Sequence, residues 1–168
     1  MRRLLDCLYT AAGVLAAVFM VGVLVCISMA IAVRQLAVHI PGLDAYAGYC
    51  MAAAGFLALA HTFRKGEHIR VTLLLASLPA RGRLRLDAFA LIIGTLIAAN
   101  LAWFSCKLVI DSHAFNDIST GDDATPLWIP QLSMALGTVI FFVAMLDETI
   151  NRLRGRPDGT TQDTALHE

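Results

Sequence analysis

Four long stretches of the sequence contain no Asp, Glu, Lys or Arg. They cover residues 7–33, 45–63, 88–106 and 127–146. Only 15% of the 168 residues are charged, whereas soluble domains have about 25%. A helix needs roughly 17–25 mostly apolar residues to cross a membrane, and each stretch is long enough. The lack of charge therefore argues against a soluble protein and predicts an all-α integral membrane protein with four transmembrane helices.

The first charge-free stretch does not have the length of a secretory signal peptide. Arg2 and Arg3 precede it, as basic residues precede such a signal, but a signal's apolar region is only about 7–15 residues long. We therefore expect a retained helix. The predicted organisation is one four-helix membrane domain over residues 1–150, followed by a polar, disordered tail over residues 151–168.

Cysteine pairs are also missing. The four cysteines lie in or beside the charge-free stretches, and none forms a C-x-x-C motif. A quinone-linked thiol oxidase of similar size needs cysteine pairs in its external loops, so this class is excluded. We interpret the cysteines as small apolar packing residues.

Ionisable residues inside a span usually mark an ion path or substrate site, and the charge-free stretches have none of the acidic or basic kind. Paired broken helices, which suggest a transporter core, are missing as well. We expect Asn100 to hydrogen-bond a neighbouring helix, and His61 has no second histidine at matched depth to share a haem. Glycines suited to close helix packing occur in every stretch: Gly13, Gly22, Gly55, Gly94 and Gly137.

Catalytic motifs are absent too. The sequence has no H-E-x-x-H, no G-x-S-x-G and no phosphate-binding glycine loop. We therefore expect no enzymatic activity, no cofactor, no bound metal and no nucleic-acid partner.

The basic residues that are present are distributed unevenly. Eleven of the 13 precede the first stretch, lie between the second and third, or follow the fourth. Only Arg34 and Lys107 lie in the other two connections. Since cytoplasmic loops carry the excess of Lys and Arg, we expect both termini and the central connection to be cytoplasmic.

The central connection contains a short apolar segment. At 100° per residue, Val71, Leu74, Leu75 and Leu78 share one side of a helix over residues 69–78, with Lys and Arg on either flank. These features predict an amphipathic helix lying in the membrane interface. A cytoplasmic loop helix packed on the transmembrane helices is the alternative.

Residues 55–87 resemble the central signature of the small membrane subunit, DctQ type, of tripartite ATP-independent periplasmic (TRAP) transporters. The matching features are a Gly- and Ala-rich end of the second span, a basic turn, H-I-x-V and a closing Leu-Pro: Gly55, Arg64, Gly66, His68, Ile69, Val71, Leu78 and Pro79. Arg34 after the first span, Asp44 opening the second, and G-x-x-x-T-P-L-x-I-P over residues 121–130 extend the resemblance.

The resemblance implies a multi-pass protein of the bacterial inner membrane that has two protein partners. One is the large membrane subunit (DctM type), which holds the substrate and sodium sites, and the other is a periplasmic substrate-binding protein (DctP type). Uptake of organic acids would use an ion gradient, and this chain would brace the large subunit. The alternatives are a membrane-anchor subunit of another complex, of the oxidoreductase type, and a small self-associating exporter.

Seven residues are candidates for contacts with partners or the membrane surface. The anchors implied by the resemblance are Arg34, Asp44, Arg64, His68 and Arg70; of these, His68 and Arg70 could instead contact lipid headgroups. Asp122 and Asp123 lie in an acidic external connection without basic residues. These two acids either follow from the topology alone or help dock the binding protein.

Overall fold

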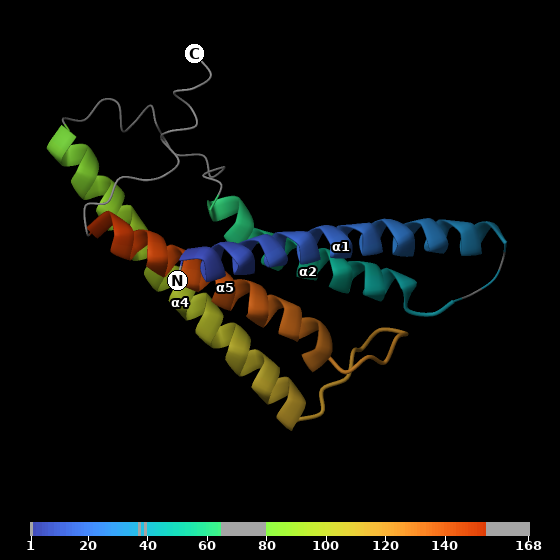
Figure 1. Cartoon of the computed structure of the whole chain (residues 1–168). Coiled ribbons are helices and arrows are strands. Elements are labelled where there is room, and N and C mark those ends of the chain that lie inside the picture. The colour runs from blue at the N-terminus through green and yellow to red at the C-terminus, as the bar shows by residue number, and fades with distance from the viewer. Residues whose placement is uncertain (1, 37, 39, 65–79, 154–168) are drawn as a thin grey trace, which may run out of the picture.

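The computed structural model describes residues 2–36, 38, 40–64 and 80–153, which form four long α-helices (Figure 1). Helix α1 covers Arg2–Gln35, α2 Leu43–Arg64, α4 Ala80–Ala114 and α5 Trp128–Leu153. All four are long and apolar enough to cross a membrane. The prediction of an all-α membrane fold with four transmembrane helices is confirmed.

Two sequence predictions concern residues that lie wholly or mostly outside the described ranges. The amphipathic helix predicted over residues 69–78 lies outside the described residues. So does most of the predicted tail, although residues 151–153 belong to the last turn of α5.

The helices continue beyond the charge-free stretches. Helix α1 includes Arg2 and Arg3 at its start and Arg34 near its end, and α4 begins eight residues before residue 88 and ends eight residues after residue 106. A charged side chain marks where a helix leaves the hydrocarbon, because its charged group lies in the headgroup region or in water. The helix itself can continue past this point, because its backbone hydrogen bonds are internal.

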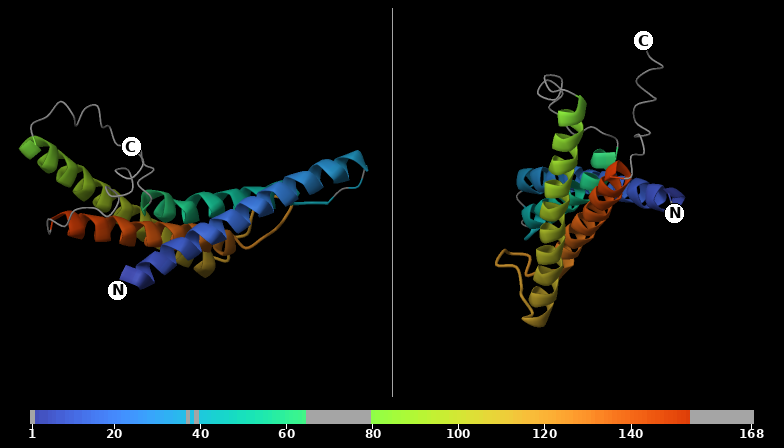
Figure 2. Two further views of the ribbon diagram at one scale, coloured as in Figure 1. Left: turned by 45° about the horizontal axis from the view of Figure 1, so that its top comes forward. Right: turned by 90° about the vertical axis from the view of Figure 1, so that its left-hand side faces the viewer.

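The four helices pack in a row in the order α1, α2, α5, α4 (Figures 1 and 2). Helices α1 and α2 form one hairpin, α4 and α5 form a second, and the contact between α2 and α5 joins them. In the part of the chain that the structure describes, α1 and α4 have no extensive contact with each other. The row is therefore open, unlike a closed four-helix bundle, and each outer helix has only one packed side.

Close approach at glycines determines how the helices pack. At Gly137 of α5, an added Cβ would lie 2.5 Å from the backbone carbonyl of Phe56 in α2. Of the five glycines predicted to support close packing, only Gly55 has no atom of another residue near such a Cβ. The other four each face a side chain or backbone of a neighbouring helix: Gly13, Gly22, Gly94 and Gly137.

A small apolar core lies where α1, α2 and α5 meet. It contains Tyr9, Ala60 and Ala144. Beside it, the rings of Phe63 and Phe141 meet edge to face with centroids 5.8 Å apart, the arrangement that aromatic pairs prefer. This contact fixes α2 and α5 near the end of the row where α1 begins.

Candidate functional site

The α1–α2 and α4–α5 connections lie at one end of the helix row, which we call the two-loop end (Figure 1). The opposite end, where α1 and α4 begin and α2 and α5 end, is the terminal end. Three of the predicted contact residues, Arg34, Asp44 and Asp122, line one pocket of about 470 Å³ at the two-loop end. Residues far apart in the sequence therefore share one surface there.

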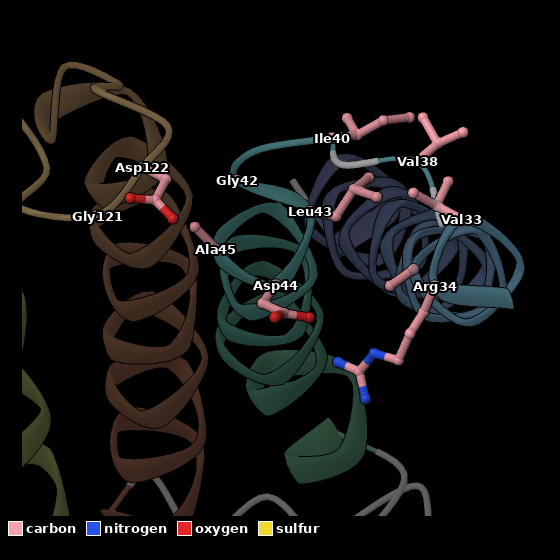
Figure 3. Close-up of a pocket in the computed structure, with 11 residues that line it drawn as sticks. Val33, Arg34, Val38, Ile40, Gly42, Leu43, Asp44, Ala45, Gly121 and Asp122 are labelled. Carbon is pink, nitrogen blue, oxygen red and sulfur yellow. The ribbon is translucent and has the colours of Figure 1, made fainter. Parts of the chain in front are cut away.

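Three segments line this pocket, and the first turn of α2 lies between the end of α1 and the α4–α5 connection. Figure 3 shows Asp122 on one side, Arg34 at the end of α1 on the other, and the Arg34 side chain extending toward the side of α2 that carries the Asp44 carboxylate. Both Arg34 and Asp44 are exposed. The rest of the wall is largely apolar: Ala30, Val33, Val38, Ile40, Leu43 and Ala45.

Helix ends explain the positions of two of these charges. Arg34 is in the last turn of α1, and Asp44 is in the first turn of α2. A cation is stabilised at the negative C-terminal end of a helix dipole, and an anion at the positive N-terminal end. Each charge therefore stabilises its own helix end, and the hairpin brings the two ends together.

Gly42 closes the turn that leads into α2. Its φ is +84°, a conformation that side-chain-bearing residues rarely adopt. An added Cβ would also come 2.7 Å from Cβ of Asp123. Glycine at this position therefore lets the α4–α5 connection lie directly against the start of α2.

The α4–α5 connection has an ordered fold of its own. Ile118 and Pro126 form an antiparallel bridge. The N–H of Ser119 donates to the Thr125 carbonyl at 2.8 Å, and the N–H of Leu127 donates to the Asp117 carbonyl at 3.0 Å. The two arms of the connection are thus paired, and its tip carries Asp122 and Asp123.

Asp123 fastens this tip to α2. Its carboxylate accepts hydrogen bonds from Tyr49 Oη at 2.9 Å and from Ser119 Oγ at 2.8 Å. Hydroxyl groups of Thr125, Ser119 and Tyr49 stabilise the charged form and lower the pKa of Asp123 from 3.8 to about 2, against a smaller opposing effect of desolvation. The carboxylate is therefore charged at physiological pH and bonded within the chain.

Asp122 differs from its neighbour because its side chain is exposed and lines the pocket. With Asp44 and Arg34 it gives the pocket two carboxylates and one guanidinium. Such a surface can accept a basic or hydrogen-bonding group of another protein. Among the described residues, no group of three or more His, Cys, Asp or Glu side chains could hold a metal ion.

Comparison with known protein families identifies one match. Residues 23–155 match the family described as "Tripartite ATP-independent periplasmic transporters, DctQ component". The match covers most of the chain, all of α2 and α4, and the two-loop end. The chain belongs to the DctQ family. Comparison with curated proteins gives no match.

Membership of the DctQ family confirms the resemblance found in the sequence. This DctQ-family chain is a small permease subunit of the TRAP transporter type and a multi-pass protein of the inner membrane. The DctQ family is a transporter-component family and not an enzyme family.

The remaining predicted contact residues of this DctQ-family subunit do not lie at the pocket. Arg64 is the last residue of α2, at the terminal end. His68 and Arg70 lie outside the described residues. Asp123 is at the two-loop end, but its carboxylate is used inside the chain. The seven candidates thus do not form one site.

Sequence reasoning missed Tyr49 and Gly42 as residues that position the loop. Tyr49 lies 74 residues from Asp123, and no local motif joins them. The tyrosines of α2 gave a partial signal, since Tyr46 and Tyr49 are one turn apart and their rings meet edge to face with centroids 6.1 Å apart. Polar aromatic residues near a helix end are typical of a membrane boundary.

The structure also shows the surroundings of two polar residues within the spans, His61 and Asn100. The ring of His61 lies against Gly13, and its Nδ1 is 3.3 Å from the Tyr9 carbonyl oxygen; these contacts join α2 to α1. Asn100, expected to bond a neighbouring helix, is exposed, and no hydrogen bond joins its side chain to any described residue.

Proposed function

We propose that this DctQ-family chain is the subunit that braces the large membrane subunit of its TRAP transporter. In this proposal the large subunit binds and moves the substrate, an organic acid delivered by a periplasmic binding protein, and an ion gradient drives uptake. The observation that carries the proposal is the family match over residues 23–155. The chain itself has no enzymatic activity in this proposal.

The packing of the chain supports a static role. Its spans have no Asp, Glu, Lys or Arg in their charge-free stretches, and its hairpins are joined at a glycine against backbone, which leaves little room for sliding. Large apolar side chains remain exposed along α1 and α4. A scaffold for a moving transport domain needs such a rigid core with free outer faces.

We propose that the two-loop end faces the periplasm. Along the sequence, eleven of the 13 basic residues precede the first charge-free stretch, lie between the second and third, or follow the fourth, and only Arg34 and Lys107 lie in the other two connections. The positive-inside rule gives this distribution for cytoplasmic termini. The pocket with Arg34, Asp44 and Asp122 then faces the compartment of the binding protein. We propose that this surface takes part in its docking.

The first test is co-purification. The tagged chain, expressed together with the large subunit and the binding protein of its own transporter, is extracted in mild detergent and its partners are identified by mass spectrometry. We expect the large subunit to be retained in a one-to-one ratio. If the chain instead purifies alone as a self-associating oligomer, the bracing proposal is wrong.

A charge reversal tests the docking surface and its orientation together. The variant Asp122→Lys should weaken binding of the binding protein to the reconstituted complex a few-fold, since one exposed ion pair contributes roughly 0–1 kcal/mol. The salt dependence of binding should also become shallower. Asp117→Lys is the matched control, because Asp117 is exposed in the same connection but does not line the pocket. Equal binding by both variants and the wild type contradicts docking at this pocket.

A further inference from the structure

Helix α4 packs on α5 through a side made of small residues. Ala98, Ala102 and Ser105 are buried there, and an added Cβ at Gly94 would come 2.5 Å from the Met145 methyl group. Because small residues recur on successive turns of α4, the backbones of α4 and α5 can approach closely. This side of α4 is therefore covered by α5.

The opposite side of α4 has no packing partner among the described residues. At 100° per residue it forms one stripe along the helix. Its large apolar members are all exposed, by 40% to 70%: Phe89, Ile93, Leu96, Ile97, Trp103 and Phe104. Asn100 lies at the centre of this stripe and is also exposed.

The depth of Asn100 makes it unlike a boundary residue. The charge-free part of α4 covers residues 88–106, so Asn100 is twelve residues from one end of this part and six from the other. At 1.5 Å per residue, the nearer end of this part is roughly 9 Å away, so the Asn100 side chain lies within the hydrocarbon-crossing part of α4. Hydrocarbon can neither donate nor accept a hydrogen bond, and burying an unbonded amide in it is costly.

The threonine side chains of these helices hydrogen-bond to backbone carbonyl groups of their own helix. Thr95 Oγ1 donates to the Leu91 carbonyl at 2.8 Å, and Thr138 Oγ1 donates to the Met134 carbonyl at 2.9 Å. The Asn100 amide has two N–H donors and one carbonyl acceptor, and no described residue bonds any of them. Its partner therefore has to come from beyond the described chain.

The exposed side of α1 provides a comparison. Between residues 14 and 27 every exposed side chain of α1 is apolar, as lipid requires. On α4, by contrast, Lys107 lies on the same stripe as Asn100, seven residues further along, and it too is exposed without an ion pair to any described residue. The α4 stripe thus presents an amide at mid-depth and an ammonium group near the two-loop end.

We propose that the α4 stripe centred on Asn100 is where a transmembrane helix of the large subunit docks. The docking helix carries a polar side chain at mid-depth that hydrogen-bonds the Asn100 amide, and an acidic side chain or carbonyl group near Lys107. The exposed side of α1 faces lipid. This inference rests on the proposed bracing function, and it adds the surface and the chemistry of the contact.

Photo-crosslinking in the intact transporter tests the assignment. A photoreactive amino acid such as p-benzoylphenylalanine replaces Ile97 or Phe104 on α4, and Val18 or Val21 on α1 as matched exposed controls. We expect crosslinks to the large subunit from both α4 positions and from neither α1 position. Crosslinks to the large subunit only from α1, or between two copies of this chain from α4, overturn the assignment.

Substitution of Asn100 tests the hydrogen bond itself. Asn100→Leu fits the apolar surroundings and should fold, but retention of the large subunit during a detergent titration should fall roughly three- to fifteen-fold, the range measured for interhelical hydrogen bonds in membranes. Asn100→Gln keeps the amide and should retain more of the partner than Asn100→Leu does. Equal retention by wild type and Asn100→Leu overturns the proposed hydrogen bond.

The two proposals fail in different ways. If the wild-type chain retains the large subunit but crosslinks or substitutions do not point to the α4 stripe, only the docking surface is wrong. If the wild-type chain retains no large subunit, the bracing function is wrong and the docking surface falls with it.

Discussion

Replacing Gly137 by valine is expected to destabilise the isolated subunit by about 3 kcal/mol, the upper part of the usual range for an overpacked contact. An added Cβ at Gly137 would lie 2.5 Å from both C and O of Phe56 and 2.9 Å from N of Leu57. These are backbone atoms of α2, which cannot rotate away as a side chain can. The helices have to separate, and this contact lies in the α2–α5 interface that joins the two hairpins. Unfolding by a denaturing detergent, followed by the helical circular-dichroism signal, measures the loss.

Gly55→Val provides the matched control for this substitution. Gly55 is on α2, one residue before Phe56, and an added Cβ there meets nothing within 4 Å. The same change of residue at the same depth of the row should therefore leave stability almost unchanged. If both variants unfold at the same denaturant concentration, α2 and α5 do not approach closely at Gly137.

The four helices could be predicted from the sequence because lipid imposes a simple rule. A segment that crosses hydrocarbon excludes charge over about 20 residues, and the four charge-free stretches follow that rule. The resemblance in residues 55–87 and 121–130 also predicted the family correctly. Both signals depend on residues close together in the sequence.

The order of the helices in the row could not be predicted in the same way. Small residues occur in every span, and composition does not reveal which of them face another helix. Gly55 and Gly137 were predicted alike, yet one faces open space and the other lies against backbone. The distinction depends on the angle and depth at which α2 crosses α5, and many residues together set that geometry.

The location of the candidate site could be predicted from the sequence, but the roles of its individual residues could not. Arg34, Asp44 and Asp122 had to lie near one end of the helices once the four spans were known. The sequence predicted the same role for Asp122 and Asp123. In the structure, the Asp123 carboxylate accepts hydrogen bonds from Tyr49 and Ser119, whereas the Asp122 side chain is exposed. Which of two adjacent carboxylates turns inward depends on the turn at Gly42 and on Tyr49, both distant in sequence.

The hydrogen bonds to Asp123 predict a pH dependence in the fold of the α4–α5 connection. The pKa of Asp123 is lowered to about 2 in the folded chain from 3.8. A lowered carboxyl pKa means that the charged form contributes stability above about pH 3.8, and that this contribution is lost as the pH falls toward about 2. Asp123→Asn removes the charge at every pH while keeping the shape of the side chain.

Hydrogen exchange of the connection, corrected for the intrinsic effect of pH, should therefore show a specific pattern. At pH 5–7 the peptide containing the N–H groups of Ser119 and Leu127, which are bonded within the connection, should exchange faster in Asp123→Asn than in the wild type. The difference should shrink as the pH falls from about 3.8 toward about 2, because the carboxyl group of the open connection takes up a proton first and that of the folded connection follows only near pH 2. Asp122→Asn changes an exposed neighbour and should match the wild type throughout. A difference between wild type and Asp123→Asn that persists unchanged at pH 2–3 would mean that the carboxylate charge does not hold the connection on α2, and the tether would then have to depend on the packing of Gly42 against Asp123.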